Sequence, residues 1–174
     1  TVNLSDPSCD NPSLHLGDIY NYSKEDHKGN VMHLADVLVA EGELVFWHEE
    51  YEVSAKRALI VGESHATLAP LNYLNQIESF HRAVALYAAA MKTKKPRYKY
   101  AANKIRKRIS KWAHYGNTTI HYYEMFLSAE KLALEKKHNQ AKLKYESAIE
   151  AVSRLGHLHH LGLFNERYSD FLLR

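Results

Sequence analysis

The chain has 174 residues and a formal net charge of +3, with 45% hydrophobic and 25% charged residues, values ordinary for a globular protein. This length suits one domain with a sizeable core, or about five helical hairpins stacked as an array. The absence of any run of eighteen apolar residues excludes a membrane-spanning helix. The single cysteine, Cys9, excludes an internal disulfide and a cysteine-based zinc motif. Only seven glycines and four prolines occur, which favours long regular elements over a turn-rich β fold.

Charge is distributed unevenly along the chain. Residues 1–64 hold twelve acidic and four basic side chains, whereas residues 65–124 hold two acidic and eleven basic ones. No acidic residue lies between Glu78 and Glu124. Such an asymmetry shapes the electrostatic field that a partner meets. One interpretation, beside a phosphate contact and a simple solvated face, is that the basic segment docks onto the acidic N-terminal third, within one molecule or between copies.

Residues 1–28 are polar, contain Pro7, Pro12 and Gly17, and show no lasting period. They predict an extended or loosely ordered N-terminal segment, followed by a helical domain over residues 29–174. The N-terminus has no basic patch before an apolar stretch, so it is not a secretory signal. Together with the single cysteine, this predicts a cytoplasmic location. Because the chain begins without Met and ends on a helical pattern, we expect it to be an excerpt of a longer protein.

The first helical pair is predicted between residues 31 and 61. Asn30 can cap a helix that starts at Val31 and contains Gly42. A glycine inside a helix costs about 1 kcal/mol relative to alanine, so we expect another helix to pack closely against Gly42. The polar break WHEEY follows, and residues 51–61 form the predicted partner helix.

Two longer helices are predicted next. Pro70 suits the first turn of a helix, and apolar residues at helical spacing continue from Leu71 to Met91. The segment KKP at 94–96 ends that helix. The following helix, over residues 98–114, has one apolar face, and the dipeptide GN at 116–117 ends it. Thr118 or Thr119 then starts a further helix.

Residues 128–151 form two predicted helices, joined by a polar turn at 138–140. Ala129, Ala141 and Ala148 lie where these helices would come closest, and Tyr145 fills the gap between them. This spacing resembles the helical hairpin of a tetratricopeptide (TPR) repeat. A last helix is predicted over 158–173, which makes about seven helices and no strand. The sequence therefore predicts an all-α fold of antiparallel helical hairpins stacked as a TPR-like α-solenoid, with a compact helical bundle as the alternative.

Residues 71–173 also resemble the TPR-like helical region of large multidomain signalling ATPases. The motifs that carry this resemblance are KW at 111–112, HYYEMFLSAE at 121–130, AKLKYESA at 141–148, LGH at 155–157 and ER at 166–167. In those proteins a protein-kinase-like domain and an AAA or STAND-type ATPase precede the helical array, and GAF, histidine-kinase or nucleotide-cyclase modules can follow it. The resemblance implies a non-catalytic sensor or scaffold arm, since the family's kinase and ATPase residues lie outside this chain.

A basic segment over residues 92–111 contains ten Lys or Arg side chains. One interpretation is a contact surface for phosphates or another anionic ligand. The simpler interpretation is the solvated outer face of an amphipathic helix, because Ala101, Ile105, Ile109 and Trp112 already define an inner face. The candidate basic patch consists of Lys99, Lys104, Arg106, Lys107, Arg108 and Lys111.

Two kinds of residue pattern could bind a metal. The motif LGHLHHLG brings His157, His159 and His160 together, and we expect His121 and His138 to lie near them. The simpler interpretation of these residues is exposed or core histidine.

The Glu-x-x-His spacing of di-metal bundles occurs at Glu78 with His81 and at Glu135 with His138. Neither pair is completed by further inward glutamates. The sequence therefore predicts no catalytic residue, no metal site and no cofactor.

The function predicted from these patterns is that of a non-catalytic protein-interaction or scaffold module in a larger signalling protein. Its partner would be another protein or a neighbouring domain of the same polypeptide, bound on a concave face formed by the first helix of each pair. Self-association is also expected, because a repeat cut from an array exposes apolar faces. The candidate partner-binding residues are Tyr73, Gln76, His121, Tyr122 and Glu124.

Two alternatives come from other functional classes. The first is binding of nucleic acid or an anionic ligand through the basic helix at 92–111. The second is an enzyme, for which a metal bound at Glu78 and His81 would be the sign.

Overall fold

The structure is a computed structural model that describes residues 31–62, 73–114 and 118–174, which form seven helices and no strand. The helices are α2 (Val31–Trp47), α3 (Tyr51–Val61), α5 (Tyr73–Thr93), α6 (Pro96–His114), α7 (Thr118–Leu134), α8 (His138–Leu155) and α9 (Leu158–Leu172). The all-α class predicted from the sequence is confirmed. The predicted segment 1–28, the cap at Asn30 and the helix start at Pro70 and Leu71 lie outside the described residues.

Three hairpins, α2/α3, α5/α6 and α7/α8, close through similar short turns. Each turn contains one non-glycine residue with a left-handed backbone: Glu49 (φ 59°), Lys94 (φ 59°) and Lys136 (φ 60°). After α7, the N–H groups of Lys136 and Lys137 donate to the carbonyls of Ala133 and Leu132, at 3.0 and 2.9 Å. These bonds satisfy carbonyls that the end of a helix leaves without a partner. The predicted turn at 138–140 is therefore wrong by three residues, because those polar residues already form the first turn of α8.

Consecutive helices pack against each other along the whole described chain. The second helix of each hairpin also contacts the first helix that follows it: α3 contacts α5, α6 contacts α7, and α8 contacts α9. The first helices α2, α5 and α7 contact one another in the same order. Stacked hairpins and a bundle with short connections both produce this succession.

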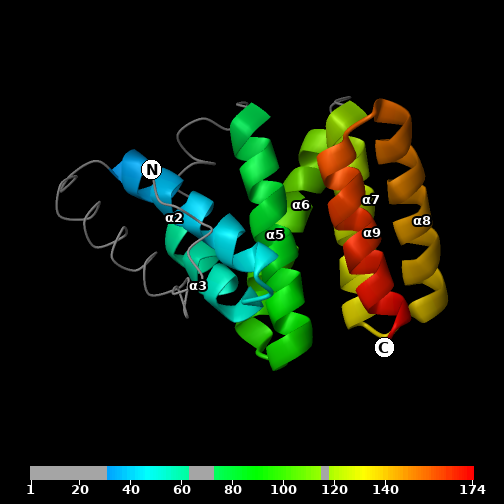
Figure 1. The fold of residues 1–174 in the computed structure, drawn as a ribbon, viewed down its shortest axis with the longest axis horizontal. Helices are drawn as coiled ribbons and strands as arrows, with labels where there is room; N and C mark the ends of the chain where they lie inside the picture. Colours follow the sequence, from blue (N-terminus) through cyan, green and yellow to red (C-terminus); the bar gives the residue numbers. More distant parts are fainter. Residues whose placement is uncertain (1–30, 63–72, 115–117) are drawn as a thin grey trace, which may run out of the picture.

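Helix α5 is the centre of the fold (Figure 1). All nine residues from Ala83 to Met91 are buried, although an amphipathic helix would leave one side in water. Five of the nine are alanines, which keep the helix narrow and allow neighbours on every side. Helices α2, α3, α6 and α7 contact α5, and aromatic side chains of α9 reach it as well. The core of the protein is therefore built around this helix.

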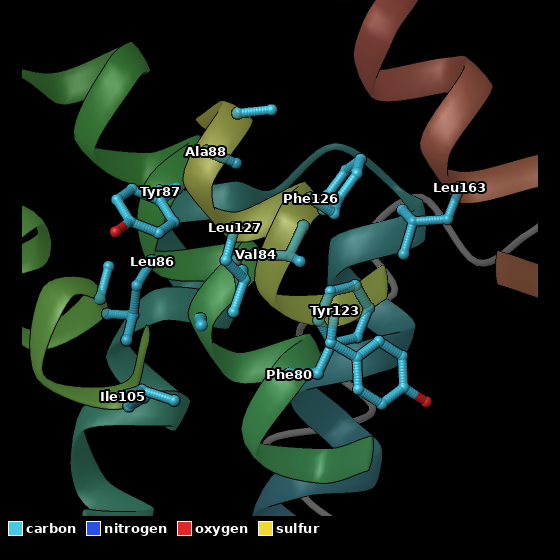
Figure 2. Packing of buried hydrophobic residues seen from close by; sticks show 14 of the residues in the cluster. Phe80, Val84, Leu86, Tyr87, Ala88, Ile105, Tyr123, Phe126, Leu127 and Leu163 are labelled. Carbon is cyan, nitrogen blue, oxygen red and sulfur yellow. The ribbon is translucent and has the colours of Figure 1, made fainter. Parts of the chain in front are cut away.

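Aromatic rings join α5, α7 and α9 in the core, and Figure 2 shows part of this packing. The ring of Phe80 on α5 stacks on Tyr123 of α7, with centroids 4.2 Å apart. The ring of Phe126 on α7 stacks on Phe164 of α9, with centroids 3.9 Å apart. All four side chains are completely buried. Large rings at these positions bury much apolar area and fix how the three helices sit against one another.

The small residues predicted at close helix contacts are buried. Ala129, Ala141 and Ala148 are completely inaccessible between α7 and α8, as is Tyr145. Gly42 on α2 lies against α3, where the Ser54 hydroxyl donates a hydrogen bond of 2.7 Å to its carbonyl. The expected close packing of a helix against Gly42 is therefore confirmed.

Candidate functional site

The five candidate partner-binding residues occupy different environments. Tyr73 begins α5, and Gln76, one turn later, is buried. On α7, His121 is exposed, Tyr122 is completely buried, and the half-buried Glu124 accepts a 2.7 Å hydrogen bond from Ser128. The structure therefore does not gather Gln76, His121, Tyr122 and Glu124 on one open surface, and the side chain of Tyr73 lies outside the described residues.

Helix α9 covers the side of α7 that carries Tyr122. Phe164 stacks on Phe126, and its ring also lies 5.9 Å from those of Phe80 and Tyr122. Buried residues of α9 recur at His160, Leu163, Phe164 and Arg167, which is the spacing of one helical face. The chain's own last helix thus covers the side of α7 that carries Tyr122, one of the candidate partner-binding residues.

A cluster of histidine and tyrosine side chains lies under the first turns of α9. His160 Nε2 is 3.4 Å from His81 Nε2 on α5, and His160 Nδ1 is 3.2 Å from the Tyr122 hydroxyl. The same hydroxyl is 3.0 Å from His157 Nδ1, and the Tyr123 hydroxyl is 3.4 Å from His160 Nε2. We call His81, His157, His159, His160 and their partners Glu43, Tyr122 and Tyr123 the histidine cluster.

The donors in this cluster follow from what each partner can accept. The Glu43 carboxylate only accepts, so His81 Nδ1–H donates to it across 2.7 Å. When His81 is neutral, its Nε2 is then an acceptor, and His160 Nε2–H donates to it. This leaves His160 Nδ1 as an acceptor for the Tyr122 hydroxyl. When His81 and His160 are both neutral, the cluster is therefore one continuous chain of hydrogen bonds that runs from Tyr122 on α7 through α9 and α5 to Glu43 on α2.

The pKa values of the cluster favour this neutral arrangement of His160. Burial lowers the pKa of His160 to about 4, and the neighbouring charges of His81, His159 and His157 act in the same direction. Burial by itself would raise the pKa of Glu43. The hydrogen bond and charge of His81, with the charges of His159 and His160, outweigh it and hold that pKa below its usual value. Glu43 therefore stays ionised in mildly acidic solution.

An ion pair anchors the opposite half of α9. Arg167 donates from Nε and Nη2 to the two carboxylate oxygens of Glu130 on α7, at 3.1 and 3.0 Å. Both side chains are inaccessible to solvent, at 1% and 0% exposed. Burial by itself would lower the pKa of Arg167, but Glu130 more than offsets this and raises it. Arg167 consequently keeps its charge in this buried position.

A narrow crevice separates α2 from α5 and α9 beside the cluster. Its walls are mostly apolar, and Glu43, His81 and Trp47 lie among its lining residues. The cavity volume is about 20 Å³. This is room for about one water molecule, since a single water needs roughly 10–15 Å³ measured in this way. The crevice as it stands does not accommodate an organic ligand.

The two Glu-x-x-His pairs do not form a metal site. The Nδ1 atom of His81 contacts Glu43, while the Oε1 atom of Glu78 lies 3.8 Å from Nη1 of Arg82. Within residues 31–62, 73–114 and 118–174, no three His, Cys, Asp or Glu side chains converge on a position that a metal ion could occupy.

The second pair faces other partners. Glu135 contacts Lys131 and Lys137, and the ring of His138 stacks on Phe171 with centroids 5.7 Å apart. The expected place of His138 beside the α9 histidines is therefore taken by His81, which lies far from them in the sequence.

The predicted basic patch divides into two groups. Arg106 and Arg108 are half-buried and hold helices together. Arg106 contacts Ser128 and Glu124 of α7, and Arg108 donates to Ser79 of α5 across 3.2 Å. The other four members are exposed on α6: Lys99, Lys104, Lys107 and Lys111.

An exposed stripe runs along the outer side of α6. Its members follow one another at intervals of three and four residues and so share one helix face: Arg97, Tyr100, Lys104, Lys107 and Lys111. Tyr100 lies in the middle of this face with 76% of its surface exposed. We call these five residues the α6 stripe.

A shallow groove of about 510 Å³ borders this stripe, between α6 and the helices α3 and α5. Its lining includes the apolar Leu59, Leu86 and Ile105. Three members of the stripe line it as well: Arg97, Tyr100 and Lys104. No acidic side chain of the described residues lines it. We call this hollow the α6 groove.

Contacts of Glu52 join the basic segment to the acidic N-terminal third, which was one of the interpretations of that segment. Glu52 on α3 accepts hydrogen bonds from Lys95 and from the Tyr98 hydroxyl. The hydrogen bond from Lys95 is the main reason that the pKa of Glu52 lies below its usual value. These contacts use the start of α6 and leave the rest of the stripe exposed.

Comparisons with known proteins find no family model, no curated protein and no solved structure that matches this chain. None of the described helices combines the length and the apolar character that crossing a bilayer requires.

Proposed function

We propose that this chain is a protein-interaction module of a larger cytoplasmic signalling protein, built as a TPR-like helical array without catalytic activity of its own. In this proposal the α6 stripe and the α6 groove bind an acidic segment of a partner protein or of a neighbouring domain. The single observation that carries the proposal is an exposed cationic helix face beside an apolar groove.

Charge complementarity supports an acidic partner. Three lysines and one arginine of the stripe face solvent at helical spacing, over a length of about four turns. Opposite charges at a surface steer association and fix orientation more than they add affinity. A segment rich in Asp and Glu would meet these charges along its whole length.

The α6 groove favours a protein segment, rather than a purely ionic polymer, as the partner. Leu59, Leu86 and Ile105 offer apolar contacts in its lining, to which the exposed Tyr100 also belongs. Binding energy at protein interfaces is concentrated in a few apolar or aromatic side chains that fill pockets. An acidic segment with one large apolar side chain would fit both parts of the surface.

The stripe with its aromatic ring also favours one second candidate, the binding of nucleic acid or another phosphate polymer. Lysine and arginine at this spacing neutralise phosphates, and an exposed tyrosine can stack on a base. Such binding would weaken steeply with salt, because it depends on the release of counterions.

Fluorescence polarisation with three labelled probes tests both candidates: a peptide of glutamates with one central leucine, the same peptide with serine in place of leucine, and an oligo(U) RNA. We expect the leucine peptide to bind best. Lys104→Glu should weaken that binding about tenfold, because it reverses a charge in the lining of the groove. Lys144→Glu is the matched control, since Lys144 is an exposed lysine on α8.

Binding of the RNA alone, with a linear dependence on the logarithm of salt concentration, would favour the second candidate. Equal binding of the two peptides would remove the role of the groove. If neither peptide nor RNA binds, the α6 stripe is only a solvated helix face and the proposed function is wrong.

A further inference from the structure

The histidine cluster lies between helices that are distant in the sequence, and the α6 surface makes no use of it. Glu43 comes from α2, His81 from α5, Tyr122 and Tyr123 from α7, and His160 from α9. The hydrogen bonds of His160 to His81 and Tyr122 are polar contacts between the first half of α9 and the rest of the protein, and His81 extends them to Glu43. Any change in their protonation therefore acts on the docking of α9.

The cluster can take up one proton without losing a hydrogen bond. If His81 is charged, its Nε2–H donates to His160, which then carries its own proton on Nδ1 and donates to the Tyr122 oxygen. The Tyr122 hydroxyl turns to His157 Nδ1, 3.0 Å away. Glu43 remains the acceptor for His81 Nδ1–H, so every ring nitrogen keeps a partner.

A second proton, on His160, has no such solution. Both Nε2 atoms would then carry hydrogens and face each other across 3.4 Å. The Tyr123 oxygen, 3.4 Å from His160 Nε2, can accept the His160 hydrogen, which leaves His81 Nε2–H facing a donor. The charged rings would also crowd together, because the centroid of His160 lies 5.6 Å from His81, 5.5 Å from His159 and 6.2 Å from His157. Like charges at such distances disfavour each other's charged form.

The other groups that face His160 do not relieve this conflict. The hydroxyls of Tyr122 and Tyr123, from α7, are uncharged in acidic solution. Glu43, from α2, is the anion of the cluster, and its hydrogen bond is already made to His81. On α9 itself the near neighbours are His157 and His159, which add positive charge when they are protonated.

We propose that α9 is an acid-sensitive latch: the joint protonation of His81 and His160 releases its first turns from α5 and α7. The release uncovers the buried side chains of Tyr122, Tyr123 and Phe80. The second half of α9 stays in place, because its ion pair between Arg167 and Glu130 contains no histidine. This inference concerns a different face from the α6 stripe and does not depend on the proposed function.

The size of the effect follows from the protonation of His160. A pKa of about 4 in the docked state, against 6.5 for a free histidine, makes proton binding favour the released state. Between neutral pH and pH 5 this linkage raises the opening equilibrium about 30-fold.

Hydrogen exchange of the intact chain at pH 7.5 and pH 5.0, corrected for intrinsic exchange rates, tests the latch. We expect the opening equilibrium for amides of residues 161–164 to rise about 30-fold at pH 5.0, while amides of residues 168–172 change less than threefold. His160→Gln keeps a polar group at the position of Nε2 but cannot be protonated, so it should abolish most of the rise. His121→Gln is the matched control, because His121 is an exposed histidine on α7, and it should behave as the wild type.

The proposal is overturned if both segments of α9 remain equally protected at pH 5.0, or if His160→Gln retains the full rise. Circular dichroism verifies that the variant is folded. Should it not fold, the wild-type data still decide the matter, since a uniform rise across all helices would mean general acid unfolding and no latch.

Discussion

The two halves of α9 are attached to the same neighbours by different chemistry. The first half rests on His160 and its ring of histidine and tyrosine partners, whose hydrogen bonds depend on where protons lie. The second half is fixed by Arg167, whose two bonds to Glu130 join fixed charges. His160 and Arg167 are both buried, so the burial of these two side chains does not separate the two contacts. The two contacts differ in whether their partners can change protonation state.

This difference shows that one helix can be permanently anchored at one end and conditionally attached at the other. A buried ion pair with all its bonds made is strongly destabilised only when one partner is removed. A buried histidine pair is destabilised by a change of solution that leaves every residue in place. A variant of His160 in the first half should therefore change the pH dependence of stability, whereas a variant of Arg167 in the second half should lower stability already at neutral pH.

The largest effect is expected from Arg167→Ala in the second half. The change leaves the carboxylate of Glu130 buried without its charge partner, and such losses amount to about 3–5 kcal/mol of the free energy of unfolding. Urea unfolding at pH 7.5 measures it. The double variant Arg167→Met with Glu130→Leu should recover most of the loss, because it removes both charges together. A loss below about 1 kcal/mol in the single variant would contradict the anchoring role of this pair.

The next effect is the loss of stability of the wild type in acid, and its sign follows from His160. The folded pKa of about 4 lies below the unfolded value of 6.5, so the unfolded chain binds more protons between these limits. Stability is therefore complete above pH 6.5 and falls as the pH approaches 4, by about 3 kcal/mol from this one group.

Urea unfolding at a series of pH values, compared between wild type and His160→Gln, isolates that contribution. The stability of His160→Gln relative to the wild type should rise by about 3 kcal/mol as the pH falls toward 4, because only the wild type takes up this proton on unfolding. Parallel curves for His160→Gln would erase the distinction between the two halves.

A smaller loss is expected for Tyr122→Phe in the first half. The change removes a buried hydroxyl that contacts both His157 and His160, at 3.0 and 3.2 Å. Unfolding should lose about 1–2 kcal/mol, because a buried hydrogen-bond partner is left unsatisfied. Thermal unfolding at pH 7.5 gives this value, and an unchanged stability would show that the hydroxyl does not hold α9.

The smallest effect is expected for Tyr168→Phe, the corresponding change in the second half. The hydroxyl of Tyr168 donates to Glu146 across 3.0 Å in an exposed position, so water can replace it. We expect a change below about 0.5 kcal/mol in the same thermal assay. A loss as large as that of Tyr122→Phe would mean that the second half also depends on a polar contact at its edge.

The helices were predictable from the sequence because their apolar spacing is a local property. Ala141, Tyr145, Ala148 and Val152 mark the inner face of α8 by spacing alone, and all four are buried. The turn before α8 was placed three residues too late. Its left-handed position is occupied by Lys136 rather than by glycine or asparagine, so the usual signal for a helix end is missing.

The candidate site was less predictable, because it depends on which helices meet. The motif LGHLHHLG marked His160 as noteworthy, but nothing local to it points to His81, 79 residues away. Tyr122 was assigned to an open face because the spacing on α7 does not reveal that α9 returns to cover it. Periodicity shows which side of a helix is apolar, and it does not show which partner covers that side.

The alanine-rich run of α5 also bears on how this protein can change during evolution. Repeat proteins commonly gain or lose whole hairpins, because each unit touches only its neighbours. Here α5 has neighbours on every side, and its alanines leave no room for larger side chains. Insertions, deletions and duplications are therefore expected to be tolerated at the outer helices and rejected at the hairpin that contains α5.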